Sequence, residues 1–250
     1  MTEYIWLLIP TLFIISLVYT SVGLGGGSSY VAFLYLFGIP LASIPPIALF
    51  FNITASSVAF YRFNKQGYVI PRKIIPFLLT SVPATFIGAR LNLNEDILSI
   101  IFAAVLVSIS VILMFRKKKS ETKFFVSKHM NLMVPSILGV VFGFLAGFMG
   151  IGGGIFLGPI LLLIGYSSSK YIASICSAFV LVNSCVGLTV HYFKGRVDMS
   201  PILLLGLVVF LGAQVGSFLG TKKFSSIMVQ RIVAVILILV SLKLGLGVLG

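Results

Sequence analysis

A glycine-dense motif occurs twice in this chain and limits what the chain can fold into. It reads Gly23-Leu24-Gly25-Gly26-Gly27 and, 127 residues later, Gly150-Ile151-Gly152-Gly153-Gly154. Each glycine costs roughly 1 kcal/mol relative to alanine inside a helix, so each motif is predicted to interrupt its helix. In lipid, backbone freed from a helix is tolerated only where protein buries it or where it lines a wet cavity. Paired interruptions in two halves therefore indicate a transport site between repeats.

The composition places the chain in the membrane. Of the 250 residues, 59% are hydrophobic and 9% are charged, whereas soluble proteins carry about 25% charged residues. Apolar segments of about 17 to 25 residues cross a bilayer as helices, and the sequence contains about eight of them. The predicted fold class is an all-α integral membrane protein, which leaves no room for a soluble catalytic domain.

The formal net charge of +13 does not predict a nucleic-acid partner here. Most lysine and arginine residues lie in the short loops between the predicted spans, where they orient a membrane protein and contact anionic headgroups. The expected partner of these side chains is the lipid bilayer.

The apolar segments follow the same order in two halves, each a broken segment followed by three spans. We predict a first repeat over residues 1–115, a basic cytoplasmic linker over 116–131 and a second repeat over 132–250. The predicted broken segments are 4–37 and 132–164, and the spans are one from Pro45-Pro46 to Tyr61, then 74–89, 97–115, 171–192, 202–219 and 229–249.

The orientation of the two halves has two solutions. If each broken segment crosses the membrane once, the halves are parallel; if each re-enters or crosses twice, they are inverted. With the linker inside, the inverted solution leaves only Arg90, Lys194 and Arg196 outside, not counting Lys243 within the last span. The parallel solution leaves more basic residues outside, so the positive-inside rule favours inverted repeats.

The helices that restart after each motif offer free backbone N–H groups and a positive dipole end, which together bind anions. Close helix packing is the alternative role for these glycines. The predicted substrate-binding backbone comprises Gly25, Gly26, Gly27 and Ser28 in the first half and Gly152, Gly153 and Gly154 in the second.

Polar side chains within the spans are the next candidates. Asn52 and Ser56 lie one helical turn apart, and Asn183 occupies the corresponding span of the second half. An amide in lipid needs a partner, which is either another helix or a polar substrate. Gln214 is a further substrate-binding candidate. His191 is expected to be a solvated interfacial residue, with a proton carrier or gate as the alternative.

Thr54, Ser57 and Ser184 lie on neighbouring helix faces and rank as weaker candidates. Two further glycine series, Gly139–Gly143–Gly147 and Gly212–Gly216–Gly220, have the spacing of small-residue helix contacts. They would serve internal packing or a homodimer interface.

The acidic residues favour an anionic or neutral substrate. All five, Glu3, Glu95, Asp96, Glu121 and Asp198, fall at termini or in loops, whereas cation transporters and proton relays rest on acids inside spans. The chain has no cluster of histidine and cysteine for a metal site, and no H-E-x-x-H or G-x-S-x-G motif. We expect no metal, no cofactor and no enzyme activity.

The paired motifs, each followed by a span with an asparagine at Asn52 or Asn183, resemble the signature of the sulfite exporter TauE/SafE family of membrane permeases. The resemblance covers essentially the whole chain. It implies a multi-pass permease of the bacterial inner membrane, built from two homologous halves, that moves a small sulfur-containing anion of the sulfite or organosulfonate type. An anion channel and a non-transporting membrane protein are the alternatives.

Overall fold

The fold is described from a computed structural model, which covers residues 5–40, 43–91, 130–194 and 200–220 and the single residues 100, 104, 107, 108, 110, 111, 114 and 238. Within these residues the secondary structure is helical, with no strand. The helices are α1 (Ile5–Thr20), α2 (Gly27–Leu36), α3 (Ile44–Lys65), α4 (Pro71–Arg90), α6 (Met130–Met149), α7 (Gly154–Leu163), α8 (Ser169–Phe193) and α9 (Ser200–Gly220).

Both glycine motifs interrupt their helices, as predicted. The first break, residues 21–26, separates α1 from α2, and the second break, residues 150–153, separates α6 from α7. Gly26 and Gly153 immediately precede α2 and α7, with φ angles of 99° and 76°. Residues with a Cβ rarely adopt this left-handed backbone conformation, so glycine at these two positions allows the chain to turn before the helix restarts.

The described helices match most of the predicted spans. Three are long and apolar enough to cross a membrane, Ile44–Lys65, Leu132–Met149 and Ser169–Phe193, and the apolar stretches Trp6–Thr20 and Leu203–Leu219 are shorter. Apart from the single residues named above, the predicted spans at 97–115 and 229–249 lie outside the described residues, as does nearly all of the linker at 116–131.

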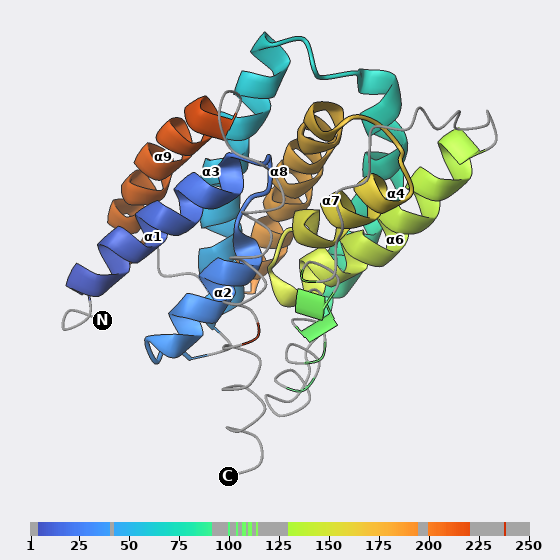
Figure 1. The fold of residues 1–250 in the computed structure, drawn as a ribbon. Coiled ribbons are helices and arrows are strands. Elements are labelled where there is room, and N and C mark those ends of the chain that lie inside the picture. The colour runs from blue at the N-terminus through green and yellow to red at the C-terminus, as the bar shows by residue number, and fades with distance from the viewer. Residues whose placement is uncertain are drawn as a thin grey trace.

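The helices form two groups that do not coincide with the halves of the sequence (Figure 1). In the first body, α1, α2 and α9 pack around α3; in the second body, α6, α7 and α4 pack around α8. Among the described helices, α3 against α8 is the one extensive contact that joins the bodies. Each body therefore combines three helices of one half with one helix of the other.

The contacts map onto each other when α1, α2, α3 and α4 are exchanged for α6, α7, α8 and α9. The α1–α9 contact becomes α6–α4, the α3–α9 contact becomes α8–α4, and α2–α3 becomes α7–α8. The α3–α8 contact maps onto itself. The same pairs of described helices are therefore in contact in the two halves, although the contacts differ in extent.

The central helices α3 and α8 are antiparallel. Gly187, late in α8, faces Leu49, early in α3. Ala173, early in α8, clusters with Phe63 at the end of α3.

Each broken segment leads back to the end of the helix bundle at which it starts. Helix α9 runs parallel to both α1 and α3, so α1 and α3 share a direction and α2 must run back between them. Helices α6 and α8 are likewise both parallel to α4. The pairs that fix these directions are Phe13–Gly212, Leu17–Gly216, Phe50–Gly206, Arg62–Gln214, Phe77–Gly139, Thr85–Gly147, Ser81–Asn183 and Ala89–Lys194.

Small residues hold each body together. Gly139, Gly143 and Gly147 lie against α4, and Gly212 and Gly216 lie against α1, each next to a side chain or carbonyl of the facing helix that a larger residue would meet. These contacts place the glycines inside one protomer, in agreement with the packing interpretation. The outward faces of α1, α4, α6 and α9 expose large apolar side chains, as a lipid-facing surface requires.

Candidate functional site

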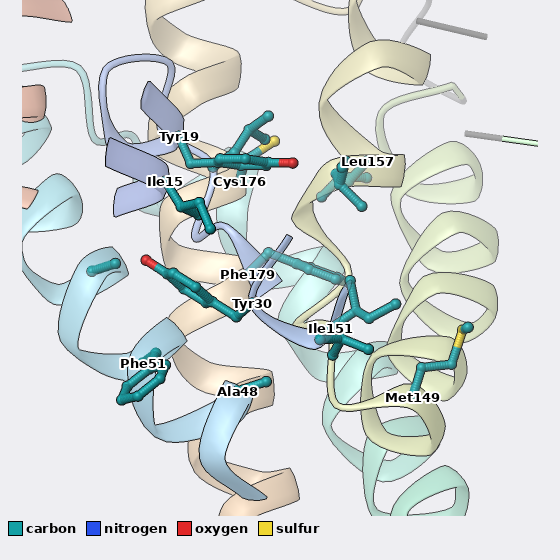
Figure 2. Packing of buried hydrophobic residues seen from close by; sticks show 14 of the residues in the cluster. Ile15, Tyr19, Tyr30, Ala48, Phe51, Met149, Ile151, Leu157, Cys176 and Phe179 are labelled. Atoms are coloured by element: carbon teal, nitrogen blue, oxygen red, sulfur yellow. The ribbon is translucent and has the colours of Figure 1, made fainter. Parts of the chain in front are cut away.

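The two breaks meet at the centre of the molecule, between the bodies. A Cβ added at Gly27, the first residue of α2, would meet the carbonyl oxygen of Ile151 in the second break. Leu24 of the first break lies 3.2 Å from the position of a Cβ at Gly158 in α7. Figure 2 shows Tyr30 and Phe51 on one side of this region and Ile151 and Phe179 on the other.

Each break also contacts the long helix of the opposite body. A Cβ at Gly23 would lie 2.6 Å from the Cβ of Ala173 in α8, and a Cβ at Gly150 would lie 2.6 Å from the Cα of Pro45 in α3. The breaks are thus joined to both bodies, so a relative movement of the bodies changes the space between them.

Asn52 of α3 directs its amide at both breaks. Its Oδ1 lies 2.7 Å from the position of a Cβ at Gly25, and its Nδ2 lies 3.0 Å from that of a Cβ at Gly152 and even closer to that at Gly27. The side chain is fully buried, yet neither amide atom has a hydrogen-bond partner among the described residues. Leaving such a group unpaired costs about 1–3 kcal/mol.

Helix α8 adds two more unpaired polar atoms. Ser184 Oγ lies 3.0 Å from the position of a Cβ at Gly152, and both this oxygen and Asn183 Nδ2 are buried without a partner in the described part of the chain. The other amide atom of Asn183 is satisfied, because Ser81 of α4 donates a hydrogen bond of 2.9 Å to its Oδ1. The site therefore presents mainly donor groups.

Two helix N-termini adjoin these side chains. Helices α2 and α7 begin at Gly27 and Gly154, directly after the breaks, and no side chain caps either start. The first N–H groups of a helix have no acceptor within it and carry partial positive charge. Together with the buried amides, they suit an anion or the negative end of a polar solute.

The structure brings together Gly25, Gly27, Gly152, Asn52 and Ser184. Gly154 lies next to Val180, which also contacts Gly25 and Gly152, and Asn183 bonds Ser81 of α4. Gly26 and Gly153 shape the turns rather than the space between the breaks: a Cβ at Gly153 would meet Phe179 and the Phe142 carbonyl, each at 2.8 Å.

Other candidates point elsewhere. The Ser28 hydroxyl faces Tyr19 at 3.4 Å, and Ser56 donates to the main-chain carbonyl of Asn52 within α3. Gln214 accepts a hydrogen bond of 3.3 Å from Arg62, near the carboxyl end of α3. His191 is only 5% exposed, so the expectation of a solvated interfacial histidine is wrong; it packs inside, near the end of α8.

Sequence reasoning ranked Ser184 too low and did not identify Ser81. Ser184 follows Asn183 directly and lies one helical turn after Val180, whose side chain contacts the positions of Cβ atoms at Gly25, Gly152 and Gly154. That spacing could have raised its rank. Nothing in the sequence links Ser81 to Asn183, which is 102 residues away.

Apolar helices, two facing breaks and a buried cluster of unpaired polar atoms define the class as a helical membrane transporter. The chain belongs to the sulfite exporter TauE/SafE family, whose model matches residues 8–244. This is a family of transporters rather than of enzymes.

Three proteins similar to this chain are also named as probable membrane transporters. A probable membrane transporter protein of Sinorhizobium fredii, y4hK, is 31% identical over 97% of this chain and 98% of its own length. The probable membrane transporter YunE of Bacillus subtilis is 24% identical over 76% of both chains. A third, ORF9 of a Sinorhizobium species, is 27% identical over 92% of this chain and 87% of its own. No solved structure matches.

Proposed function

We propose that this protein is a multi-pass permease of the bacterial inner membrane that moves a small sulfur-containing oxyanion, of the sulfite or organosulfonate type, by alternating access. The family name supports the substrate class. The observation that carries the proposal is the set of buried, unpaired polar atoms of Asn52 and Ser184 beside two uncapped helix starts. Asn183, which precedes Ser184 in α8, adds a further buried and unpaired atom, Nδ2.

The chemistry of this set favours an anion. Asn183 and Ser184 offer N–H and O–H donors, and Asn52 offers a donor and an acceptor. A hydrogen bond to a charged group contributes about 1.5–3 kcal/mol, so a few such donors hold a small oxyanion without a full positive charge.

The packing favours a movement of the two bodies rather than of the two sequence halves. A separation of the halves would break the α4–α6 and α1–α9 contacts, where glycines lie against backbone carbonyls. Among the described helices, a shift of the first body against the second needs a change mainly at α3–α8 and at the breaks. With α3 and α8 antiparallel, two inverted repeats would then open the site to alternate sides of the membrane.

The test of function is flux in proteoliposomes of labelled sulfite, thiosulfate, sulfate and methanesulfonate, with and without a proton gradient. We expect saturable flux with counterflow for at least one sulfur anion, and its at least tenfold reduction in Gly27→Ala. Flux that rises linearly with concentration would indicate a channel instead. Absence of flux for every anion, in protein that remains folded, would contradict the proposal.

Cross-linking tests the movement of the bodies. With Cys176 and Cys185 replaced by alanine, the pair Leu49→Cys and Gly187→Cys places thiols across the α3–α8 contact. A short bifunctional thiol reagent is expected to lower the transport rate more than tenfold, because it links the two bodies covalently.

The matched control is Phe50→Cys with Gly206→Cys, which joins α3 to α9 within the first body. Its cross-link should leave transport within about twofold of the untreated protein. Equal inhibition of the two pairs would contradict the assignment of the moving bodies.

A further inference from the structure

The two asparagines of the site are held differently, and the difference lies in what surrounds each amide. Asn52, in the first body, has no described partner for either Oδ1 or Nδ2. Asn183, in the second body, has its Oδ1 bonded by Ser81, so only its Nδ2 is unpaired. An amide with neither atom bonded presents either end, whereas an amide bonded at its oxygen presents its N–H groups.

Ser81 is itself held in place. It is fully buried in α4, and a Cβ added at Gly143 of α6 would lie 2.6 Å from the Ser81 Cα and 2.7 Å from its Cβ. The other described acceptor near its hydroxyl, the Leu78 carbonyl, is more distant at 3.5 Å. Since α4, α6 and α8 belong to the second body, the Ser81–Asn183 bond stays within one body when the bodies move.

The described part of the first body has no hydroxyl at the corresponding place. At the place on the α1–α9 contact that corresponds to Ser81, α9 carries Val209, whose main-chain carbonyl accepts a hydrogen bond from Ser16. The valine side chain has no donor or acceptor to offer Asn52.

We propose that Ser81 is a positioning residue that fixes the Asn183 amide with its N–H groups toward the substrate, so that the second body selects a substrate oxygen that carries no hydrogen. This inference rests on the proposed function of the same site. A charged sulfonate group, whose oxygens only accept hydrogen bonds, meets this requirement. A sulfonamide of the same shape presents N–H groups where the sulfonate presents an oxygen.

The experiment compares methanesulfonate with methanesulfonamide as inhibitors of labelled sulfite uptake in proteoliposomes. The wild-type protein should require at least tenfold more sulfonamide than sulfonate for half inhibition. In Ser81→Ala the Asn183 amide is free to rotate and offer its oxygen to an N–H group, so this ratio should fall to within about threefold. A purely structural role for Ser81 would change inhibition by both compounds equally.

Ser177→Ala is the matched control, because Ser177 is a fully buried serine of α8 whose hydroxyl bonds the Ser174 carbonyl of its own helix at 2.9 Å. Its ratio should stay at the wild-type value. If Ser81→Ala does not fold, Ser81→Cys keeps the side-chain size with a weaker donor and should also lower the ratio.

The outcomes separate the two proposals. Sulfite uptake by the wild type with a ratio that is unchanged in folded Ser81→Ala or Ser81→Cys would overturn the positioning role and leave the proposed function standing. The same holds if the two compounds inhibit the wild type equally or if neither does. A wild-type protein that takes up no sulfur anion would instead overturn the proposed function.

Discussion

Replacement of Gly27 by alanine is expected to reduce transport at least tenfold while the protein still inserts and folds. The new methyl group would enter the point where the breaks meet, against the Ile151 carbonyl oxygen and the Asn52 amide nitrogen. Overpacking of this kind costs about 1–3 kcal/mol where the surroundings shift to accept it. That shift would displace Asn52 and separate the breaks, so the cost falls on substrate binding.

The matched control is Gly158→Ala in α7. A Cβ there would contact only the ends of two side chains, Leu24 Cδ2 at 3.2 Å and Cys176 Sγ at 3.4 Å, both of which have room to rotate. Its transport should remain within about twofold of wild type. Initial rates of sulfite uptake, normalised to folded protein in the liposomes, provide the measurement. Wild-type rates in Gly27→Ala would refute the site between the breaks.

Asn52→Leu and Asn183→Leu are expected to abolish transport but to change stability in opposite directions. Leucine has nearly the shape of asparagine, so each substitution mainly removes the polar atoms. At Asn52 both atoms are buried and unpaired, and their removal should raise the melting temperature. At Asn183 the substitution leaves the Ser81 hydroxyl without its acceptor and should lower it.

Each substitution is expected to change the free energy of unfolding by about as much as one hydrogen bond contributes in a membrane protein, roughly 0.6–1.7 kcal/mol. Thermal unfolding in detergent, followed beside the uptake assay, measures both effects. A stabilised Asn52→Leu that no longer transports would identify a group kept for function at the expense of stability. If Asn52→Leu instead lowers the melting temperature as much as Asn183→Leu, Asn52 is a structural residue and its place in the site is wrong.

Family membership agrees with the resemblance drawn from the paired motifs. The positions of the breaks followed from local chemistry, because consecutive glycines disfavour a helix wherever they occur. The same is true of the long helices, which follow the length and apolar character of their segments. Asn52 and Asn183 were recognisable as candidates because an amide is rare and costly in lipid.

The tertiary contacts of the polar side chains were much less predictable from the sequence. Gln214 and Asn183 are both amides within apolar helices, yet one pairs with Arg62 at the end of α3 and the other with Ser81 in α4. His191 follows a run of apolar residues and precedes Tyr192 and Lys194, a pattern typical of an interface, but the neighbouring helices bury it. For both amides the residue that forms the hydrogen bond is far away in the sequence.

The sequence by itself determined the membrane class, the two interruptions and the pair of asparagines, because these depend on residue type and on spacing within one segment. Only the tertiary structure decided that α4 joins α6 and α9 joins α1, that α3 and α8 are antiparallel, and that Ser81 holds Asn183. The physical reason is that small-residue faces fit several partners equally well in lipid. Which faces meet is decided by the packing of all the helices together, and that packing also places the breaks against each other.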